Sequence, residues 1–375
     1  MTTMNVKLFA CCFCVMTLWM ACRKKSDEAV PEDNTLALQK KVLKNIGEHL
    51  ILESYHDFTL KCTVLNEACD AFIATPSLST LATAQNAWKD AKKTWKRCEV
   101  FNFGPAESLL IGSSIDNLLI NTAGIESNIV TTEPIANDYI ETLPSNTKGL
   151  TALEYLLFDR NDNNTIINHF TVDAGFENRK LYLLALCENL DAKATIIFNE
   201  WSPDQNNYLA TFEKSTGTKV SSSLSLLVNS MIKSCDGIKT TKLGIPLGKT
   251  TGTITPLSVE AYYSTYSVSS IKEMIICYQN ILTGHGYGNM DGNGINILLN
   301  DNDFKENTYN NVIVSIDKNL TNADLITTPL DEAAQNSDAH AIALYDSSNE
   351  LLILLKNELS SVLNVLVTFT DSDGD

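Results

Sequence analysis

The chain has 375 residues, 44% of them apolar and 19% charged, which suits one large helical bundle or two ordinary domains and excludes the disordered class. Its formal net charge is -17. This acidic excess argues against a nucleic-acid-binding protein, which needs clustered Lys and Arg, and against adsorption of the folded body to anionic membranes.

The N-terminus contains an apolar run that ends at a cysteine. A fourteen-residue apolar run over 8–21 is too short to span a bilayer as a stable helix, and it ends abruptly at Cys22 before a charged stretch. A small residue, Ala21, before a Cys at this switch resembles the lipoprotein cleavage site. We predict a signal peptide over 1–21, lipidation of Cys22 and a flexible tether over 22–35. A plain signal peptide or an uncleaved anchor are the alternatives.

The helices are outlined by proline, which is costly inside a helix and here falls only at the edges of stretches with apolar residues at helical spacing. Alternating strand patterns are scarce, apart from a short strand that could lie over 365–369. The region 244–256 holds five Gly or Pro residues and is the candidate hinge. The sequence predicts an all-α fold of two packed helical-bundle domains, over 36–243 and 257–375. The predicted helices cover 36–72, 79–101, 151–158, 172–201, 220–243, 270–282, 303–320, 329–345 and 349–366.

Most cysteines of the predicted mature chain lie inside these apolar helical stretches, where Cys behaves as a small hydrophobic residue. An oxidising compartment would permit disulfides, but no Cys or His spacing suggests a zinc site. We expect buried free thiols. Besides Cys22, the residues concerned are Cys62, Cys69, Cys98, Cys187, Cys235 and Cys277.

Several motifs occur in a recognisable order. The first has the form W-x6-W-x3-E-x-F-x2-G-P, from Trp88 to Pro105. It is followed by the segment 149–157, GLTALEYLL, then by 259–264, VEAYYS, and by a Tyr and Gly at 278 and 284. Together these motifs resemble the imelysin family, in particular its lipoprotein members from Bacteroides-like bacteria, over essentially the whole mature chain.

The resemblance implies an all-helical protein of two bundles with a pocket near their interface. Some family members are described as insulin-cleaving metallopeptidases, and many are associated with bacterial iron uptake. The family signature is G-x-H-x-x-E, whose His and Glu are the candidate metal ligands. Gly149 and Glu154 match this signature, but the histidine position is Thr151.

The departure at Thr151 changes the expected chemistry. His and Glu three residues apart on a helix can share one metal ion, whereas a threonine hydroxyl is a poor replacement. Thr151-x-x-Glu154 is also a capping-box pattern, so we expect these side chains to cap a helix, with ligand binding by Glu154 as the alternative. Hydrolysis needs a metal-activated water and a base, and neither is visible, so peptidase activity is not expected.

Other residues are candidates for a ligand-binding pocket. Trp88 and Trp95 share a helix face, where core packing is the alternative role, and Glu99 follows Trp95 by one turn. Glu99 either lines a pocket or pairs with a base such as Lys92 or Arg160. In the second half, Glu260 and Ser264 are similarly placed. The full predicted pocket is Trp95, Glu99, Thr151, Glu154, Glu260 and Ser264.

A metal site is the remaining candidate. His49, Glu53 and His56 stand at i, i+4 and i+7 of the first predicted helix, which would place three ligands on one face. With Glu154 they are the candidate metal ligands, for iron or zinc. A polar stripe in contact with water is the plain alternative.

These observations favour a non-catalytic lipoprotein of the cell envelope, associated with the uptake of iron or another nutrient. It would hold a metal, a metal complex or a short peptide in a cleft between the two bundles. We expect it to be anchored through Cys22 to the outer membrane, periplasmic or surface-exposed, with an outer-membrane uptake partner. The alternatives are a metallopeptidase that uses Glu154 with His49 or His56, and a structural or protein-interaction lipoprotein.

Overall fold

A computed structural model of the chain describes residues 34–286 and 292–368, and these residues form helices and loops without a strand. The all-α prediction is therefore confirmed. The predicted signal peptide, Cys22 and the start of the tether lie outside the described residues, as does the tail from Phe369. Among the described helices, none is both long enough and apolar enough to cross a membrane.

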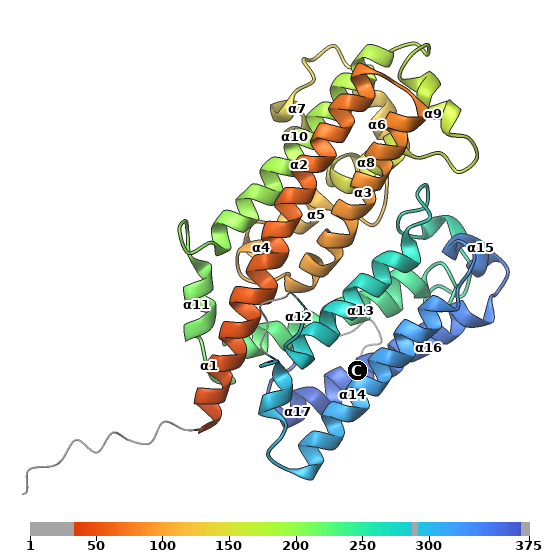
Figure 1. Cartoon of the computed structure of the whole chain (residues 1–375). Helices are drawn as coiled ribbons and strands as arrows, with labels where there is room; N and C mark the ends of the chain where they lie inside the picture. Colours follow the sequence, from red (N-terminus) through yellow and green to blue (C-terminus); the bar gives the residue numbers. More distant parts are fainter. Residues whose placement is uncertain (1–33, 287–291, 369–375) are drawn as a thin grey trace, which may run out of the picture.

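The first half is built around three long helices, α2 (Glu53–Ala74), α3 (Leu78–Cys98) and α10 (Phe176–Trp201), with α2 between the other two (Figure 1). The break before α3 falls where Pro76 predicts it, and the Ser77 side chain caps the new helix by accepting a hydrogen bond from the Thr80 N–H at 3.2 Å. The other helices of this half are α1 (Asn34–Ile46), α4 (Pro105–Ser108), α5 (Ile111–Ile115), α6 (Thr122–Ile129), α7 (Asn137–Thr142), α8 (Gly149–Leu157), α9 (Asn163–His169) and α11 (Tyr208–Lys214).

The second half packs its helices below the first in the view of Figure 1, with α14 lying between α13 and α16. Three π-helical segments continue helices directly: Gly47–Leu52 links α1 to α2, Leu354–Leu359 links α16 to α17, and Ile238–Gly244 extends α12 and ends in a turn. Single 3-10 turns cover Glu99–Phe101, Ser145–Thr147, Pro256–Ser258 and Ile295–Leu298. The helices of this half are α12 (Ser223–Gly237), α13 (Ser267–Thr283), α14 (Asp303–Asp324), α15 (Leu330–Gln335), α16 (Ala339–Ile353) and α17 (Ser360–Val362).

Aromatic side chains fill much of the core of the first half. The fully buried Trp201 ring packs against Tyr55, Phe103, Tyr208 and Phe212, with ring centroids 5.0–6.1 Å apart. The six cysteines of the described residues are buried and form no disulfide, so the prediction of buried free thiols is confirmed.

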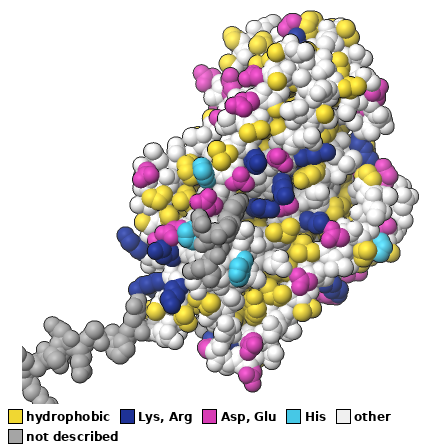
Figure 2. Space-filling model, in the orientation of Figure 1, with side chains coloured by type: hydrophobic (Ala, Val, Ile, Leu, Met, Phe, Trp, Pro, Cys, Tyr) yellow, Lys and Arg dark blue, Asp and Glu magenta, His cyan; other side chains and the backbone are white. Residues whose placement is uncertain are grey.

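The two halves meet along α3, against which α13 packs. On the face drawn in Figure 2, Lys and Arg side chains gather next to Asp and Glu side chains where the halves meet. α12 lies on the N-terminal side of the predicted domain boundary at 243, yet it packs against α16 of the second half. The division into two domains stays a prediction.

Two predictions near the C-terminus are wrong. The predicted break between Tyr345 and Asn349 falls inside the continuous α16, and the real break lies at 336–338. Ser337 there adopts a left-handed φ of 53°, and the Asp338 carboxylate caps α16 by accepting hydrogen bonds from the N–H groups of His340 and Ala341. The predicted strand is also absent, because residues 365–368 have no ladder partner among the described residues and follow α17 as an irregular segment.

Candidate functional site

Two lysines project from the buried face of α3. The side chains of Lys92 and Lys96 are 1% and 2% exposed. One turn before Lys92, the indole Nε1–H of Trp88 donates to the Leu150 carbonyl oxygen at 2.8 Å and so fixes α3 against α8. Burying an ammonium group is costly unless a carboxylate compensates it, so these two lysines require acidic partners in the interior.

The partners come from segments far apart in the sequence. One further lysine lies in the π-helical segment Ile238–Gly244, and the three acids follow α3, follow α5 and precede α13. The six side chains form three formal positive and three formal negative charges at the junction of the halves. We call this group the charge cluster, and its members are Lys92, Lys96, Lys242, Glu99, Asp116 and Glu260.

Every acid of the charge cluster touches more than one lysine. The Lys92 Nζ lies 2.7 Å from both oxygens of Asp116 and 2.8 Å from Glu260 Oε1. The Lys96 Nζ lies 2.6 Å from Asp116 Oδ2 and also contacts the two glutamates. The Lys242 Nζ lies 2.6 Å from Glu260 Oε2 and 3.4 Å from a Glu99 oxygen. The cluster therefore joins the two halves, because Lys92 and Lys96 of the first half pair with Glu260 of the second, and Lys242 of the second half pairs with Glu99 of the first.

The mutual attraction within the cluster outweighs the cost of burial. Burial by itself lowers the pKa of Lys96, but the carboxylates of Asp116, Glu260 and Glu99 raise that pKa well above its usual value. Burial would raise the pKa of Glu260, but Lys242, Lys92 and Lys96 hold it well below the usual value. The pKa of Glu99 is lowered in the same way by Lys242 and Lys96. All of these groups are thus charged near neutral pH.

Among the described residues, the three acids of the charge cluster lie close enough together to act as ligands of one metal ion. Oxygens of Glu99, Asp116 and Glu260 lie within 4.8 Å of one another. However, lysine ammonium groups already contact all three carboxylates, and a dication among them would lie against three positive charges. These residues do not fit a metal ion, since the lysines supply the positive charge that a metal would bring.

The His49 cluster does not assemble in the described structure either. His49 Nε2 lies 3.6 Å from Glu48, and His56 Nδ1 lies 4.0 Å from Glu53 and stacks on Phe198. The three proposed ligands do not come together because the π-helical segment Gly47–Leu52 changes the helical register between them. The i, i+4, i+7 spacing assumed a regular α-helix.

Thr151 and Glu154 do not form the predicted capping box. α8 begins at Gly149, with Lys148 as the residue before it and no side-chain cap, so Thr151 lies inside the first turn. Its Oγ1 accepts a hydrogen bond from the Asn117 N–H at 3.1 Å and lies 2.5 Å from the Asn117 carbonyl oxygen. It also lies 3.2 Å from the Asp116 carboxylate. The hydroxyl therefore orients a member of the charge cluster.

Glu154 reaches across to the second half of the molecule. It is 3% exposed, and its Oε1 accepts hydrogen bonds from the Ser264 N–H at 2.8 Å and the Ser264 hydroxyl at 2.9 Å. With Thr151 it lines a cavity of about 180 Å³, which we call the Glu154 cavity. Burial raises the pKa of Glu154 to about 7, although the Ser264 N–H and the Lys92 charge counteract part of this rise.

The raised pKa of Glu154 predicts how the substitution Glu154→Gln changes the free energy of unfolding with pH. The folded chain binds this proton more tightly than the unfolded chain, so the stabilisation is fully present below pH 4.5 and is lost as the pH rises through about 7. The amide cannot ionise and keeps an acceptor for Ser264. At pH 8 we expect the variant to exceed the wild type in unfolding free energy by up to about 3 kcal/mol, at about 1.4 kcal/mol for each pKa unit. Urea unfolding at pH 4 and pH 8 measures this, and an equal difference at both values would contradict it.

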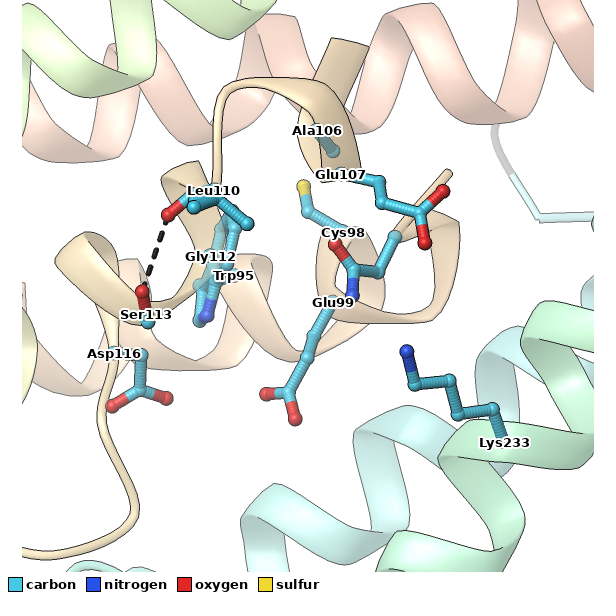
Figure 3. A pocket seen from close by; sticks show the side chains of 11 residues that line it. Trp95, Cys98, Glu99, Ala106, Glu107, Leu110, Gly112, Ser113, Asp116 and Lys233 are labelled. Carbon is cyan, nitrogen blue, oxygen red and sulfur yellow. Dashed lines mark hydrogen bonds between the residues drawn. The ribbon is translucent and has the colours of Figure 1, made fainter. Parts of the chain in front are cut away.

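A larger cavity opens beside the charge cluster, and we call it the Trp95 cavity (Figure 3). Its volume is about 360 Å³, within the range of small-molecule sites. The Trp95 ring is 2% exposed, packs on Phe58 with centroids 5.1 Å apart, and has no acceptor for its Nε1–H among the described residues. Two cavities of about 170 and 240 Å³ adjoin it and share Asn102 and Lys233 with it. Its lining residues include Trp95, Glu99, Ala106, Glu107, Leu110 and Lys233.

The structure thus distributes the predicted pocket over three adjoining places. Trp95 and Glu99 line the Trp95 cavity, Thr151 and Glu154 line the Glu154 cavity, and Glu260 belongs to the charge cluster. Ser264 is the hydrogen-bond partner of Glu154. One residue that sequence reasoning missed connects all three places, because Asp116 pairs with the lysines, contacts Thr151 and lines the Trp95 cavity.

Sequence reasoning missed three further residues. Lys96 had a detectable signal, since it follows Lys92 by four residues on a helix face that also carries Trp88. Lys242 and Lys233 had none, because nothing in their local sequence shows that α12 packs against the 3-10 turn Glu99–Phe101 at the end of α3. Arg160, considered as a partner of Glu99, instead pairs with Asp331 at 2.9 Å.

Comparisons with known proteins agree with this fold. A structure of an iron-regulated protein A precursor from Parabacteroides distasonis superimposes with a TM-score of 0.72 at 21% identity, covering 88% of this chain and 95% of the other. An imelysin-like protein from Psychrobacter arcticum gives a TM-score of 0.69 at 17% identity, covering 89% and 98%. At these identities the likeness establishes the fold.

Sequence comparisons extend the agreement. The iron-regulated protein A of Synechococcus elongatus is 22% identical over 268 residues, which cover 70% of this chain and 66% of the relative, just under two thirds of its length. The model of the imelysin family, a peptidase family, matches residues 51–355, and this range includes both cavities and the whole charge cluster. The chain belongs to the imelysin family.

Proposed function

We propose that this protein is a non-catalytic binding protein of the cell envelope that serves iron uptake or the uptake of a related nutrient. It holds a small solute in the Trp95 cavity, where the two halves meet. A lipid on Cys22 anchors it to the outer membrane.

The observation that carries this proposal is the closure of the charge cluster. Metal-assisted hydrolysis needs an open coordination position for a water molecule. Here the converging carboxylates of Asp116 and Glu260 are bonded to Lys92, Lys96 and Lys242. The adjoining Trp95 cavity is open, with a volume of about 360 Å³, and supplies room for a ligand beside groups that have no hydrolytic arrangement.

The link to iron rests on the relatives. Two of them carry the name iron-regulated protein A, one as a sequence relative and one as a structural relative. The link to the envelope rests on the lipoprotein signal that ends at Cys22. A purely structural role would be favoured by a junction filled with side chains, whereas the two halves leave both the Trp95 and the Glu154 cavities open.

Growth of the host bacterium without this gene tests the proposal. We expect slower growth when iron is limiting and normal growth when iron is abundant. The wild-type gene should restore growth, and so should Glu154→Gln, because the proposed role uses no carboxylate chemistry at that position. Equal growth of the deletion strain and its parent under iron limitation would refute the proposed role.

The alternative function is that of a metallopeptidase, favoured by the family and by a buried carboxyl, Glu154, whose pKa is about 7 and which faces a cavity. It predicts peptide cleavage in the presence of zinc or iron that a chelator and Glu154→Gln both abolish. We expect neither the wild-type protein nor the Glu154→Gln variant to cleave peptides.

A further inference from the structure

Two charged side chains at the Trp95 cavity stand outside the charge cluster. Lys233 on α12 and Glu107 on α4 are both exposed and line the cavity. Neither has an ion-pair or hydrogen-bond partner for its charged group among the described residues, and no contact of 4.0 Å or less joins them to each other. The cavity therefore presents one unpaired positive group and one unpaired negative group.

The two charged groups lie on one side of the cavity. Figure 3 shows the Lys233 ammonium and the Glu107 carboxylate at the side away from Asp116 and Ser113. They approach from different elements, because Glu107 lies on α4 of the first half and Lys233 lies on α12 of the second half. A ligand between them would contact both sides of the junction.

Apolar side chains line the cavity across from these charges, and Figure 3 shows Trp95 and Leu110 on the side of Ser113 and Asp116. The Trp95 indole and Ala106 form part of the wall, and Leu110 at the rim is 74% exposed. Leu110 also holds a left-handed φ of 51°, which is uncommon for a residue with a bulky apolar side chain. Exposed apolar surface next to a cavity favours a ligand with an apolar part.

The neighbouring charge cluster does not favour either sign of ligand. Two of its acids, Glu99 and Asp116, also line the cavity, but each of these carboxylates is already paired with two lysines of the cluster. A simple anion would be attracted by Lys233 but repelled by Glu107. A simple cation would be attracted by Glu107 but repelled by Lys233. A ligand with both charges can satisfy both groups at once.

We propose that the Trp95 cavity binds a small zwitterion with an apolar side chain, of the class of free α-amino acids. Lys233 pairs with its carboxylate, Glu107 pairs with its ammonium group, and the side chain lies against Trp95 and Leu110. This inference rests on the proposed function, since it names the class of solute that the binding protein takes.

Calorimetric titration of the purified mature chain with three related probes tests the inference. Leucine carries both charges at neutral pH, N-acetylleucine carries the negative charge alone, and leucine amide carries the positive charge alone. We expect leucine to bind at least tenfold more tightly than either derivative. Equal affinities for the three probes, or no binding of leucine, would overturn the inference.

Two substitutions assign the contacts. Glu107→Gln should remove the preference for leucine over N-acetylleucine and keep the preference over leucine amide. Lys233→Met should do the reverse. Both positions are exposed, so we expect folded variants, and the matched controls Glu67→Gln and Lys41→Met change exposed charges that line neither cavity. Unchanged preferences in Glu107→Gln and Lys233→Met would also overturn the inference.

Failure of this inference can be distinguished from failure of the proposed function. If leucine does not bind but the deletion strain still grows slowly under iron limitation, the solute class is wrong and the role in uptake stands. If leucine binds and growth is normal, the cavity is a zwitterion site and the role in iron uptake is wrong.

Discussion

Replacing Lys96 with Met should lower the free energy of unfolding by about 3–5 kcal/mol, the cost of removing one partner from a buried ion-pair group. Lys96 contacts Asp116, Glu99 and Glu260, and its own side chain is 2% exposed. The substitution keeps most of the side-chain volume but leaves the buried carboxylates one positive charge short. Urea unfolding near pH 7 measures the loss.

Lys93→Met is the matched control for this prediction. Lys93 is the neighbouring residue on α3, its side chain is 45% exposed, and its ammonium lies 3.7 Å from Glu273. Ion pairs of this exposed kind contribute about 0–1 kcal/mol. Similar losses for the two variants would show that the charge cluster does not stabilise the junction as described.

Gly149→Ala should lower the free energy of unfolding by about 2–5 kcal/mol, combining left-handed strain with overpacking. Gly149 has a φ of +67°, and a Cβ atom there would lie 2.3 Å from the Ile115 carbonyl oxygen and 2.5 Å from that of Ser114. These are backbone atoms directly before Asp116, so relieving the contact must move a member of the charge cluster. The glycine of the family signature is thus required by the close approach of α8 to the end of α5.

The variant Gly175→Ala separates the cost of left-handed strain from the cost of overpacking. Gly175 has a φ of +84°, and a Cβ atom there would meet nothing within 4 Å. Its replacement should cost only the conformational strain, about 1–2 kcal/mol. Equal losses in urea unfolding for the two glycines would mean that the approach of α8 to Ile115 is not tight.

The helices of this protein could be predicted largely from local sequence. Proline positions and apolar spacing located α2, α3 and α10, because both features act within a few residues. The break before α16 was missed because its signal is a single capping residue, Asp338, after a left-handed Ser337. That combination has no proline or glycine to mark it.

The candidate site could be predicted only in part. Trp95 and Glu99 belong to a family motif and do line a cavity, whereas Lys242 and Asp116 reach the same place through tertiary packing that no local pattern encodes. Thr151 and Glu154 were assigned to the wrong contacts, because α8 begins at Gly149. Their partners, Asn117 and Ser264, are distant in sequence.

The central claim is that lysines, and not a metal, balance the converging carboxylates, so that the protein binds a solute without cleaving it. Elemental analysis of the purified mature chain, followed by calorimetric titration with zinc and iron, tests this claim most directly. We predict no stoichiometric metal in the wild type or in Glu154→Ala. Stoichiometric binding of either metal would contradict the claim, and a tenfold weakening of that binding by Glu154→Ala, about 1.4 kcal/mol, would place the metal site at Glu154.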